Sequence, residues 1–105
     1  MRLNASQHVA IQQAARETLP AGTAVYLFGS RTDDARRGGD IDLLVESPSE
    51  LAPQEAIKRR TRFAAHLYRL LDEQRIDILM AQRGQTDVSP VVQSARRHGI
   101  KLVET

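Results

Sequence analysis

Three aspartates in two short apolar segments are the residues of this chain whose types and spacing could do chemistry. Asp40 and Asp42 stand in the segment Asp-Ile-Asp-Leu-Leu-Val, and Asp77 lies within Ile-Asp-Ile-Leu-Met. In a strand, alternate side chains share a face, so Asp40 and Asp42 would lie side by side. Like charges this close repel each other unless a cation sits between them. Magnesium binds carboxylate oxygens and accepts phosphate oxygens and water as further ligands, so this pair predicts a Mg²⁺ site.

Asp77 supplies a third carboxylate. An aspartate inside so apolar a run is costly to bury without a partner. If segment 76–81 is a strand beside segment 40–45, Asp77 can project on the same face as Asp40 and Asp42. Three carboxylates on neighbouring strands can hold two Mg²⁺ ions, which together contact the attacking and leaving oxygens of a nucleotidyl transfer. The pattern therefore predicts metal-binding and catalytic roles for all three aspartates.

Gly29-Ser30 would supply a complementary phosphate-binding turn at the end of the segment Thr-Ala-Val-Tyr-Leu-Phe. Glycine allows a ligand to approach the backbone closely, and amides at a helix start together with the Ser30 hydroxyl can hold a phosphate. Arg36 and Arg37, in the loop before the acids, are further phosphate candidates. Each feature alone has a plain structural explanation, as a turn, an alternating surface strand or an edge-strand aspartate. Their conjunction in this order favours one polyphosphate and metal site.

Together these motifs resemble those of the minimal nucleotidyltransferases of the DNA polymerase β superfamily. In that pattern a strand ends in Gly-Ser, the next strand carries Asp-x-Asp, and a later strand bears a third acid. Here these are Gly29-Ser30 followed by Arg31, Asp40-Ile-Asp42, and Asp77. The resemblance covers nearly the whole chain. Gly39 departs from it, because small members often carry serine there, but no expected metal ligand is missing.

The resemblance implies both an activity and a partner. It assigns triphosphate binding to Gly29, Ser30 and Arg31. It assigns metal binding and catalysis to Asp40, Asp42 and Asp77. Asp77 would also help to activate the acceptor hydroxyl. Small members resemble the antitoxin of a two-gene system whose other product is a HEPN ribonuclease toxin. The implied activity is Mg²⁺-dependent transfer of AMP from ATP to a tyrosine hydroxyl of that toxin.

Two other functions remain open from the sequence. The chain could be an antitoxin that neutralises its partner by binding alone, without catalysis. It could also transfer a nucleotide to a small molecule such as an antibiotic. Enzymes of that kind carry an additional helical domain that helps to bind the acceptor, and this chain has no residues to form one. The sequence is also compatible with either a homo-oligomer or a hetero-oligomer.

The elements that must position these residues alternate along the chain. Apolar periodicity and capping residues predict helices over residues 4–18, 53–73 and 90–98, and strands over 23–28, 40–45, 76–81 and 100–104. A single helical turn over 32–37 would separate the first two strands. This order predicts an α/β (α+β) fold with a polymerase β-like nucleotidyltransferase core, in which helices pack on a small mixed sheet.

Composition narrows the class of protein further. The 105 residues are expected to form a single nucleotidyltransferase domain over residues 1–105, and the absence of cysteine excludes a disulfide framework and a thiolate zinc site. A net charge of +2 and only four aromatic residues disfavour a nucleic-acid partner. No segment is apolar for long enough to span a membrane, and no signal peptide is evident, so a cytoplasmic location is expected. So small a domain leaves little for an acceptor pocket, which predicts that a macromolecule brings the acceptor.

Overall fold

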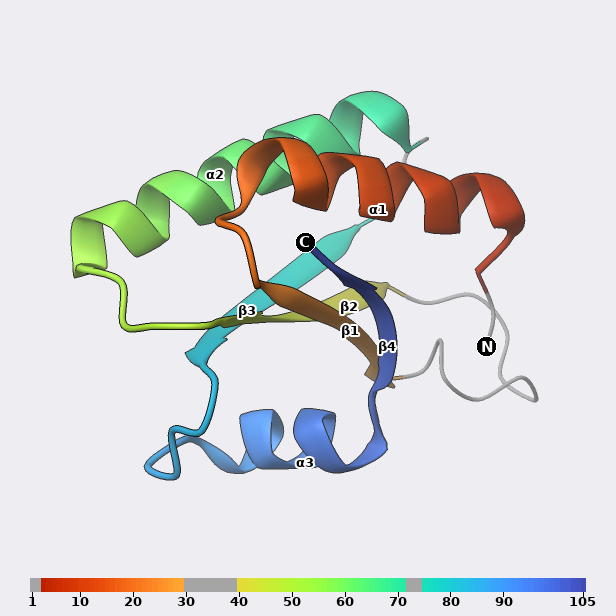
Figure 1. Ribbon diagram of the computed structural model, residues 1–105. Coiled ribbons are helices and arrows are strands. Elements are labelled where there is room, and N and C mark those ends of the chain that lie inside the picture. Colours follow the sequence, from red (N-terminus) through yellow and green to blue (C-terminus); the bar gives the residue numbers. More distant parts are fainter. Residues whose placement is uncertain (1–2, 30–39, 72–74) are drawn as a thin grey trace.

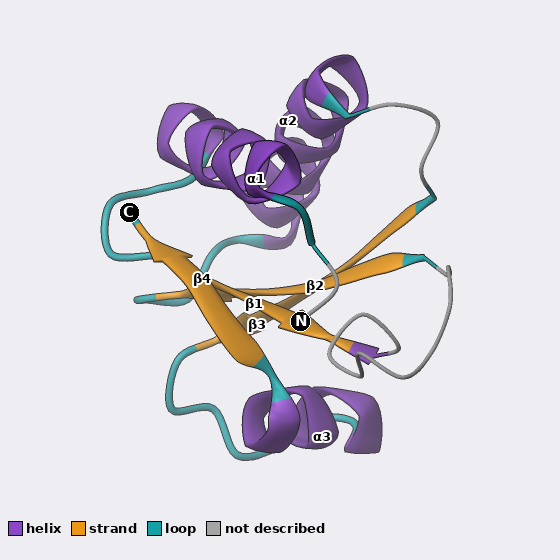
Figure 2. Cartoon of the chain, turned by 90° about the vertical axis from the view of Figure 1, so that its right-hand side faces the viewer, coloured by secondary structure: helices purple, strands orange, loops and turns teal. Residues whose placement is uncertain are grey.

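A four-stranded sheet with helices on both faces forms the fold of the computed structural model, which describes residues 3–29, 40–71 and 75–105. The elements in chain order are α1 (Ala5–Thr18), β1 (Ala24–Phe28), β2 (Ile41–Ser47), α2 (Pro53–Leu70), β3 (Ile76–Gln82), α3 (Pro90–His98) and β4 (Ile100–Glu104). Helices α1 and α2 cover one face and α3 the other (Figures 1 and 2). This arrangement confirms the predicted mixed fold. No helix among the described residues is long and apolar enough to cross a membrane.

The strand order is β3-β2-β1-β4. β1 pairs antiparallel with both β2 and β4, whereas β2 and β3 run parallel. The sheet is therefore mixed, as the sequence predicts. Because β1 runs opposite to the parallel pair, its C-terminus lies at the same end of the sheet as the N-termini of β2 and β3. Among the described residues, Gly29, Asp40, Asp42 and Asp77 lie at or near that end of the sheet.

Several element boundaries differ from the sequence prediction. Strand β2 continues to Ser47, past the predicted end at 45, because Glu46 and Ser47 still pair with Ala81 and Gln82 of β3. Helix α2 ends at Leu70 rather than at 73, since Leu71 adopts an extended backbone and its N–H caps the helix. β1 begins one residue later than predicted. The helical turn expected over 32–37 lies outside the described residues.

Helix α1 begins where its capping residues predict. The Asn4 side chain accepts a hydrogen bond of 2.7 Å from the Gln7 amide, and the Gln7 side chain accepts one of 3.1 Å from the Asn4 amide. This reciprocal capping box satisfies two amides that the first helical turn leaves unpaired. The buried face of α1, which carries Ile11, Ala14 and Ala15, is composed mostly of small residues. Small side chains allow α1 to pack closely on α2 and β4.

Strand β2 is buried on both faces, which explains its nearly continuous apolar run. Ile41, Leu43 and Val45 face the main core under α1 and α2. Leu44 belongs instead to the small cluster on the α3 side. Asp42 alternates with the first set and so shares the face of Leu44. Asp42 therefore lies on the face of β2 opposite to Ile41, Leu43 and Val45, as the alternation of the sequence indicates.

A candidate active site at the start of the parallel strands

Asp42 and Asp77 are direct neighbours across the parallel pair of strands. They stand in register, with Ile41 opposite Ile76 and Asp42 opposite Asp77. Burial raises the pKa of the Asp42 carboxyl above its ordinary value of 3.8, and the negative charges of Asp77 and Asp40 raise it further. The cluster therefore disfavours the charged form of Asp42, as neighbouring acids do when no cation lies between them.

Asp40 lies directly before β2, and Arg75, directly before β3, lies close to both Asp40 and Asp77. The Arg75 Nε atom is 3.6 Å from Asp40 Oδ2 and 3.8 Å from Asp77 Oδ1. Its positive charge opposes the rise in the pKa of Asp42. Arg75 is not among the site residues that the sequence predicts. Its position two residues before Asp77 puts it on the same face as Asp77. Only the parallel pairing of β2 with β3 brings it near Asp40 as well.

Gly29 brings the end of β1 against the Asp42 carboxylate. Phe28 pairs with Asp42 across the antiparallel ladder, and Gly29 follows with a φ of +76°. A Cβ atom at this position would lie 2.3 Å from Asp42 Oδ2. Both the left-handed backbone and the close approach exclude side chains here. The glycine of the predicted phosphate-binding turn therefore also shapes the carboxylate cluster.

Helix α2 holds the strand that carries Asp77. β3 is an edge strand, and the Ile76 amide donates a hydrogen bond of 3.3 Å to the Tyr68 hydroxyl oxygen. The Arg60 Nε atom donates one of 3.3 Å to the Ile78 carbonyl. These contacts satisfy backbone groups of the outer edge on both sides of Asp77. Asp77 is thus fixed by β2 on one side and by α2 side chains on the other.

The described residues supply the metal-binding half of the predicted site and part of its phosphate-binding half. Asp40, Asp42, Asp77 and Gly29 come together at one edge of the sheet. Ser30 and Arg31, for which the sequence predicts nucleotide binding, lie outside the described residues, as do residues 36–37. Phosphate contacts by these residues remain predictions.

The three aspartates offer the ligand chemistry that a divalent metal prefers, but their side chains are not arranged around one metal position. All three side chains offer hard oxygen ligands, and those of Asp40 and Asp77 are 41% and 48% exposed, which leaves room for water and phosphate oxygens. Within the described part of the chain, no group of three or more His, Cys, Asp or Glu side chains is placed so that it could hold a metal ion. Asp42 lies beside Asp77 instead, and Asp40 faces Arg75. A turn of Arg75 away from the acids would free their oxygens for a metal.

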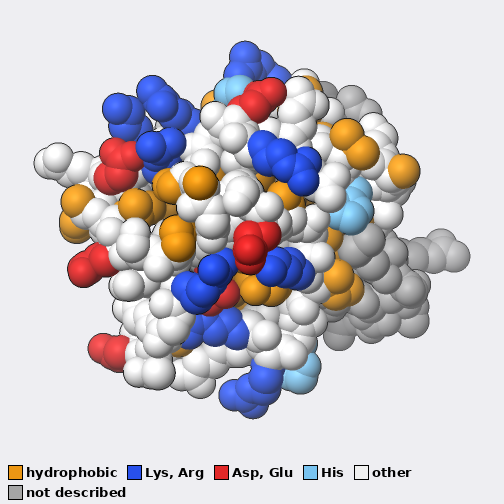
Figure 3. All heavy atoms as spheres, viewed as in Figure 1, with side chains coloured by type: hydrophobic (Ala, Val, Ile, Leu, Met, Phe, Trp, Pro, Cys, Tyr) orange, Lys and Arg blue, Asp and Glu red, His pale blue; other side chains and the backbone are white. Residues whose placement is uncertain are grey.

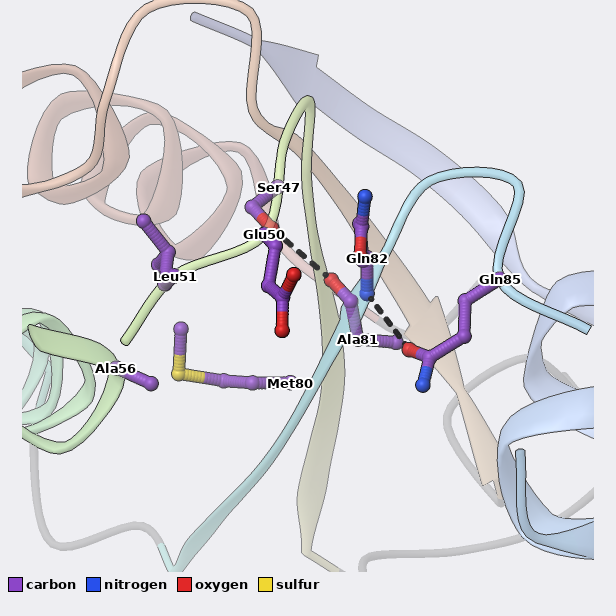
Figure 4. Close-up of a pocket in the computed structure, with 8 residues that line it drawn as sticks. All are labelled: Ser47, Glu50, Leu51, Ala56, Met80, Ala81, Gln82 and Gln85. Carbon is purple, nitrogen blue, oxygen red and sulfur yellow. Dashed lines mark hydrogen bonds between the residues drawn. The ribbon is translucent and has the colours of Figure 1, made fainter. Parts of the chain in front are cut away.

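A separate hollow lies at the other end of the parallel strands. Its volume is about 220 Å³, and Figure 4 shows Met80 extending across it toward Ala56. The Ser47 hydroxyl at its wall already donates to the Ser49 carbonyl at 2.7 Å. Glu50 is the one acidic residue among its lining residues. The hollow lacks the grouped carboxylates of the opposite edge, so the candidate site stays with the aspartates.

The charged surface carries both signs. Lys, Arg, Asp and Glu side chains are interleaved on the face shown in Figure 3. Glu104 of β4 pairs with Lys101 of the same strand at 2.7 Å and with Arg83, which follows β3, at 3.3 Å. Mixed charge of this kind differs from the single-sign stripe of a nucleic-acid-binding surface.

Comparison with known families decides the class of the protein. A sequence family described as a nucleotidyltransferase domain matches residues 10–99. The chain belongs to this nucleotidyltransferase domain family. The match spans the whole candidate site, from Gly29 to Asp77, and confirms the resemblance drawn from the motifs. No curated protein matches the chain in sequence.

Solved structures share the fold. A chain of a doubly substituted MntA–HpeT toxin–antitoxin complex has a TM-score of 0.63 at 22% identity, over 98% of this chain and 75% of that one. A chain of a complex between the tri-AMPylated Shewanella oneidensis HEPN toxin and MNT antitoxin has a TM-score of 0.59 at 22% identity, over 94% and 71%. A toxin–antitoxin structure with AMP-PNP gives 0.63 at 22% identity, over 93% and 73%. At this identity the likeness establishes the nucleotidyltransferase fold.

Proposed function

We propose that this nucleotidyltransferase transfers AMP from ATP, with Mg²⁺, to a hydroxyl of a partner protein, and that the partner is a HEPN-type toxin that it neutralises. The observation that carries the proposal is the cluster of Asp40, Asp42 and Asp77 at the sheet edge where Gly29 ends β1. The similarity in fold to chains of toxin–antitoxin complexes, one with an AMPylated toxin, supports the choice of acceptor.

In the proposed reaction the acceptor hydroxyl oxygen attacks the α-phosphorus of ATP. The new P–O bond forms as the bond from the α-phosphorus to the bridging oxygen breaks, and pyrophosphate leaves. The hydroxyl proton passes to the Asp77 carboxylate, which lies on the edge strand and is 48% exposed. Asp40 and Asp42 would hold the metal together with Asp77, and a bound Mg²⁺ would neutralise charge on the reacting phosphate oxygens.

The open position of the site favours a protein acceptor over a small molecule. The Asp40 and Asp77 side chains are about half exposed, and β3 is an edge strand of the sheet that the described residues form. A bulky partner can therefore bring a hydroxyl to Asp77 without displacing an element of the described fold. A small acceptor would need a pocket beside the carboxylates. The two hollows that touch β3 among the described residues, one at Met80 and one at Ile76 and Ile78, are not lined by the three aspartates.

The test is AMP transfer to the co-expressed product of the neighbouring gene. With ATP labelled at the α-phosphate and Mg²⁺, the parent protein should label its partner. Asp77→Asn should lower the initial rate by at least about 100-fold, because the base and one metal ligand are lost together. Asp87→Asn, at an exposed position outside the cluster, is the matched control and should keep the parent rate.

The outcome also separates catalysis from neutralisation by binding. If Asp77→Asn still forms the complex but no longer protects cells from the partner, neutralisation requires transfer. If the variant protects as well as the parent does, the protein acts by occlusion, and the proposed role of transfer is wrong. Absence of label with every partner would exclude the activity itself.

A further inference from the structure

Arg75 is the positively charged residue that touches the carboxylate cluster within the described part of the chain. Its backbone is fixed, because its carbonyl accepts a hydrogen bond of 2.9 Å from the Ile41 amide at the start of β2. Its side chain is 74% exposed. A fixed backbone with a free side chain places the guanidinium beside the acids and still allows it to turn away.

The contacts of Arg75 are loose. At 3.6 Å from Asp40 and 3.8 Å from Asp77, the Nε atom lies within ion-pair distance, but beyond the distance of a good hydrogen bond. Exposed pairs of this kind are weak and respond to salt. Arg75 therefore balances the charge of two carboxylates without binding either one tightly.

Arg75 in this position acts in opposite ways on the binding of a free divalent cation and of a metal–nucleotide complex. A free divalent cation entering the cluster must displace Arg75 from the oxygens and is then repelled by the remaining positive charge. A metal that arrives with a nucleotide triphosphate brings a net negative charge, to which the exposed guanidinium can turn. Guanidinium groups bind phosphate oxygens well, often through two N–H donors.

We propose that Arg75 is a counter-ion that disfavours free divalent metal at Asp40 and Asp77 and favours the metal–nucleotide complex by contacting its phosphate groups. The proposal rests on the proposed function only in placing the nucleotide at this cluster. Metal and nucleotide would then enter the site together, and the partly exposed acids would bind little free metal in their absence. Arg75 is thus a positioning residue for the nucleotide and selects the form in which the metal arrives.

The test is a pair of calorimetric titrations of the full chain at constant pH and ionic strength. One titrates Mg²⁺ alone, and the other titrates Mg²⁺ with a non-hydrolysable ATP analogue. In Arg75→Gln, the Kd for Mg²⁺ alone should fall about threefold to tenfold, and the Kd for the metal–analogue complex should rise by a similar factor. Both changes should shrink as salt is added, because the site is open to solvent.

Two further variants serve as controls. Arg75→Lys keeps the charge and should leave the Kd for Mg²⁺ alone close to that of the parent, while binding the complex less well because it lacks the two-donor geometry. Arg83→Gln removes an exposed arginine that pairs with Glu104 beyond the other end of β3, and should change neither Kd. A thermal melt of each variant checks that the fold is intact.

The result that overturns the proposal is a shift of both affinities in the same direction, or no shift, in Arg75→Gln. If Arg75 had a merely structural role, its substitution would weaken the binding of both ligands. Neither titration requires an acceptor or any transfer of AMP, so failure of the labelling experiment leaves this test informative. If the parent chain itself binds neither the metal nor the complex, nucleotide binding at the cluster is wrong, and the role of Arg75 is excluded with it.

Discussion

The Asp42 carboxylate is less stable as an anion in the folded chain than in the unfolded chain. Burial disfavours its charge, and Asp77 and Asp40 repel it. The same crowding makes the cluster attractive to a cation, because a divalent charge offsets the repulsion of Asp42 by both Asp77 and Asp40. The grouping of acids around Asp42, which metal binding requires, therefore reduces the stability of the folded protein when no metal is bound.

Replacement of Asp42 by asparagine should therefore stabilise the protein at neutral pH. An acid whose pKa is raised by folding binds its proton more tightly when folded, so stability falls as pH rises from 3.8 through the raised pKa. Asp42→Asn removes that loss and can still donate to Asp77. Urea unfolding at pH 7 should show a gain of a few tenths to about 1 kcal/mol, limited by partial exposure.

The pH dependence provides the check on that prediction. Below pH 3.8 Asp42 is protonated in both states, so the stabilities of Asp42→Asn and the parent should converge. Asp87→Asn, at an exposed loop position, should show no such divergence at higher pH. A lower stability of Asp42→Asn at neutral pH would contradict the assigned cause of the shift.

Gly29→Ala should disturb the site more than its small size suggests. Its φ of +76° is unfavourable for alanine, and its Cβ would lie 2.3 Å from Asp42 Oδ2. We expect a loss of about 2–3 kcal/mol in the free energy of unfolding and at least about a tenfold fall in AMP transfer, because Asp42 must move.

Gly84→Ala isolates the backbone contribution. Gly84 has a similar φ of +80°, but no atom lies within 4 Å of its Cβ position. Its substitution should cost about 1 kcal/mol, measured by urea unfolding, and leave transfer unchanged. Equal losses of stability at the two glycines would show that contact with Asp42 is unimportant.

Among the elements, α3 is attached to the sheet largely through one arginine. Arg96 Nε donates to Glu46 Oε2 at 2.6 Å, and its other nitrogens donate to the Gln82 and Gln85 carbonyls, the former at 2.8 Å. The Glu46 side chain is only 9% exposed. The helix itself contributes only Val92 and Ala95 to its small apolar cluster. Polar contacts therefore carry much of the attachment of this layer.

Arg96→Met should destabilise the protein by about 2–4 kcal/mol in urea unfolding, because it leaves the Glu46 charge buried and unpaired. Arg97→Met, at the next and exposed position of α3, should cost less than about 0.5 kcal/mol. The double variant with Glu46→Gln should recover part of the loss, since the unpaired charge is gone. Similar values for Arg96→Met and Arg97→Met would show that the ion pair contributes little.

At the scale of the whole molecule, the two faces of the sheet contribute unequally. The main core gathers residues from α1, α2 and all four strands, whereas the α3 face holds a small cluster. The carboxylates emerge on the thinner side at the edge of the sheet. The site is therefore supported by a core that lies mostly on the opposite face, which separates the packing that stabilises the fold from the charges that bind ligands.

Phe63 is the largest fully buried side chain of that core. Phe63→Ala should lower the free energy of unfolding by about 3–5 kcal/mol, a large part of the 5–15 kcal/mol typical of a domain. Circular dichroism during urea unfolding measures the change, and Phe63→Leu provides a milder variant if the alanine form does not fold.

Ile57→Ala on the same helix is the control for that loss, because Ile57 is 64% exposed. It should change stability by less than about 0.5 kcal/mol. A small effect of Phe63→Ala, comparable to that of Ile57→Ala, would contradict the assignment of the main core to the face under α2.

Local patterns in the sequence determined the types of the elements, the two faces of β2 and the choice of the three aspartates. These properties depend on residues close together in the chain, where periodicity and capping act. The sequence left open which strands pair, in what register and with what neighbours. The parallel register that sets Asp42 beside Asp77, the approach of Gly29 to Asp42, and the place of Arg75 between the acids were decided only by the tertiary structure. Such contacts depend on how distant segments bury their apolar faces together, which no local spacing specifies.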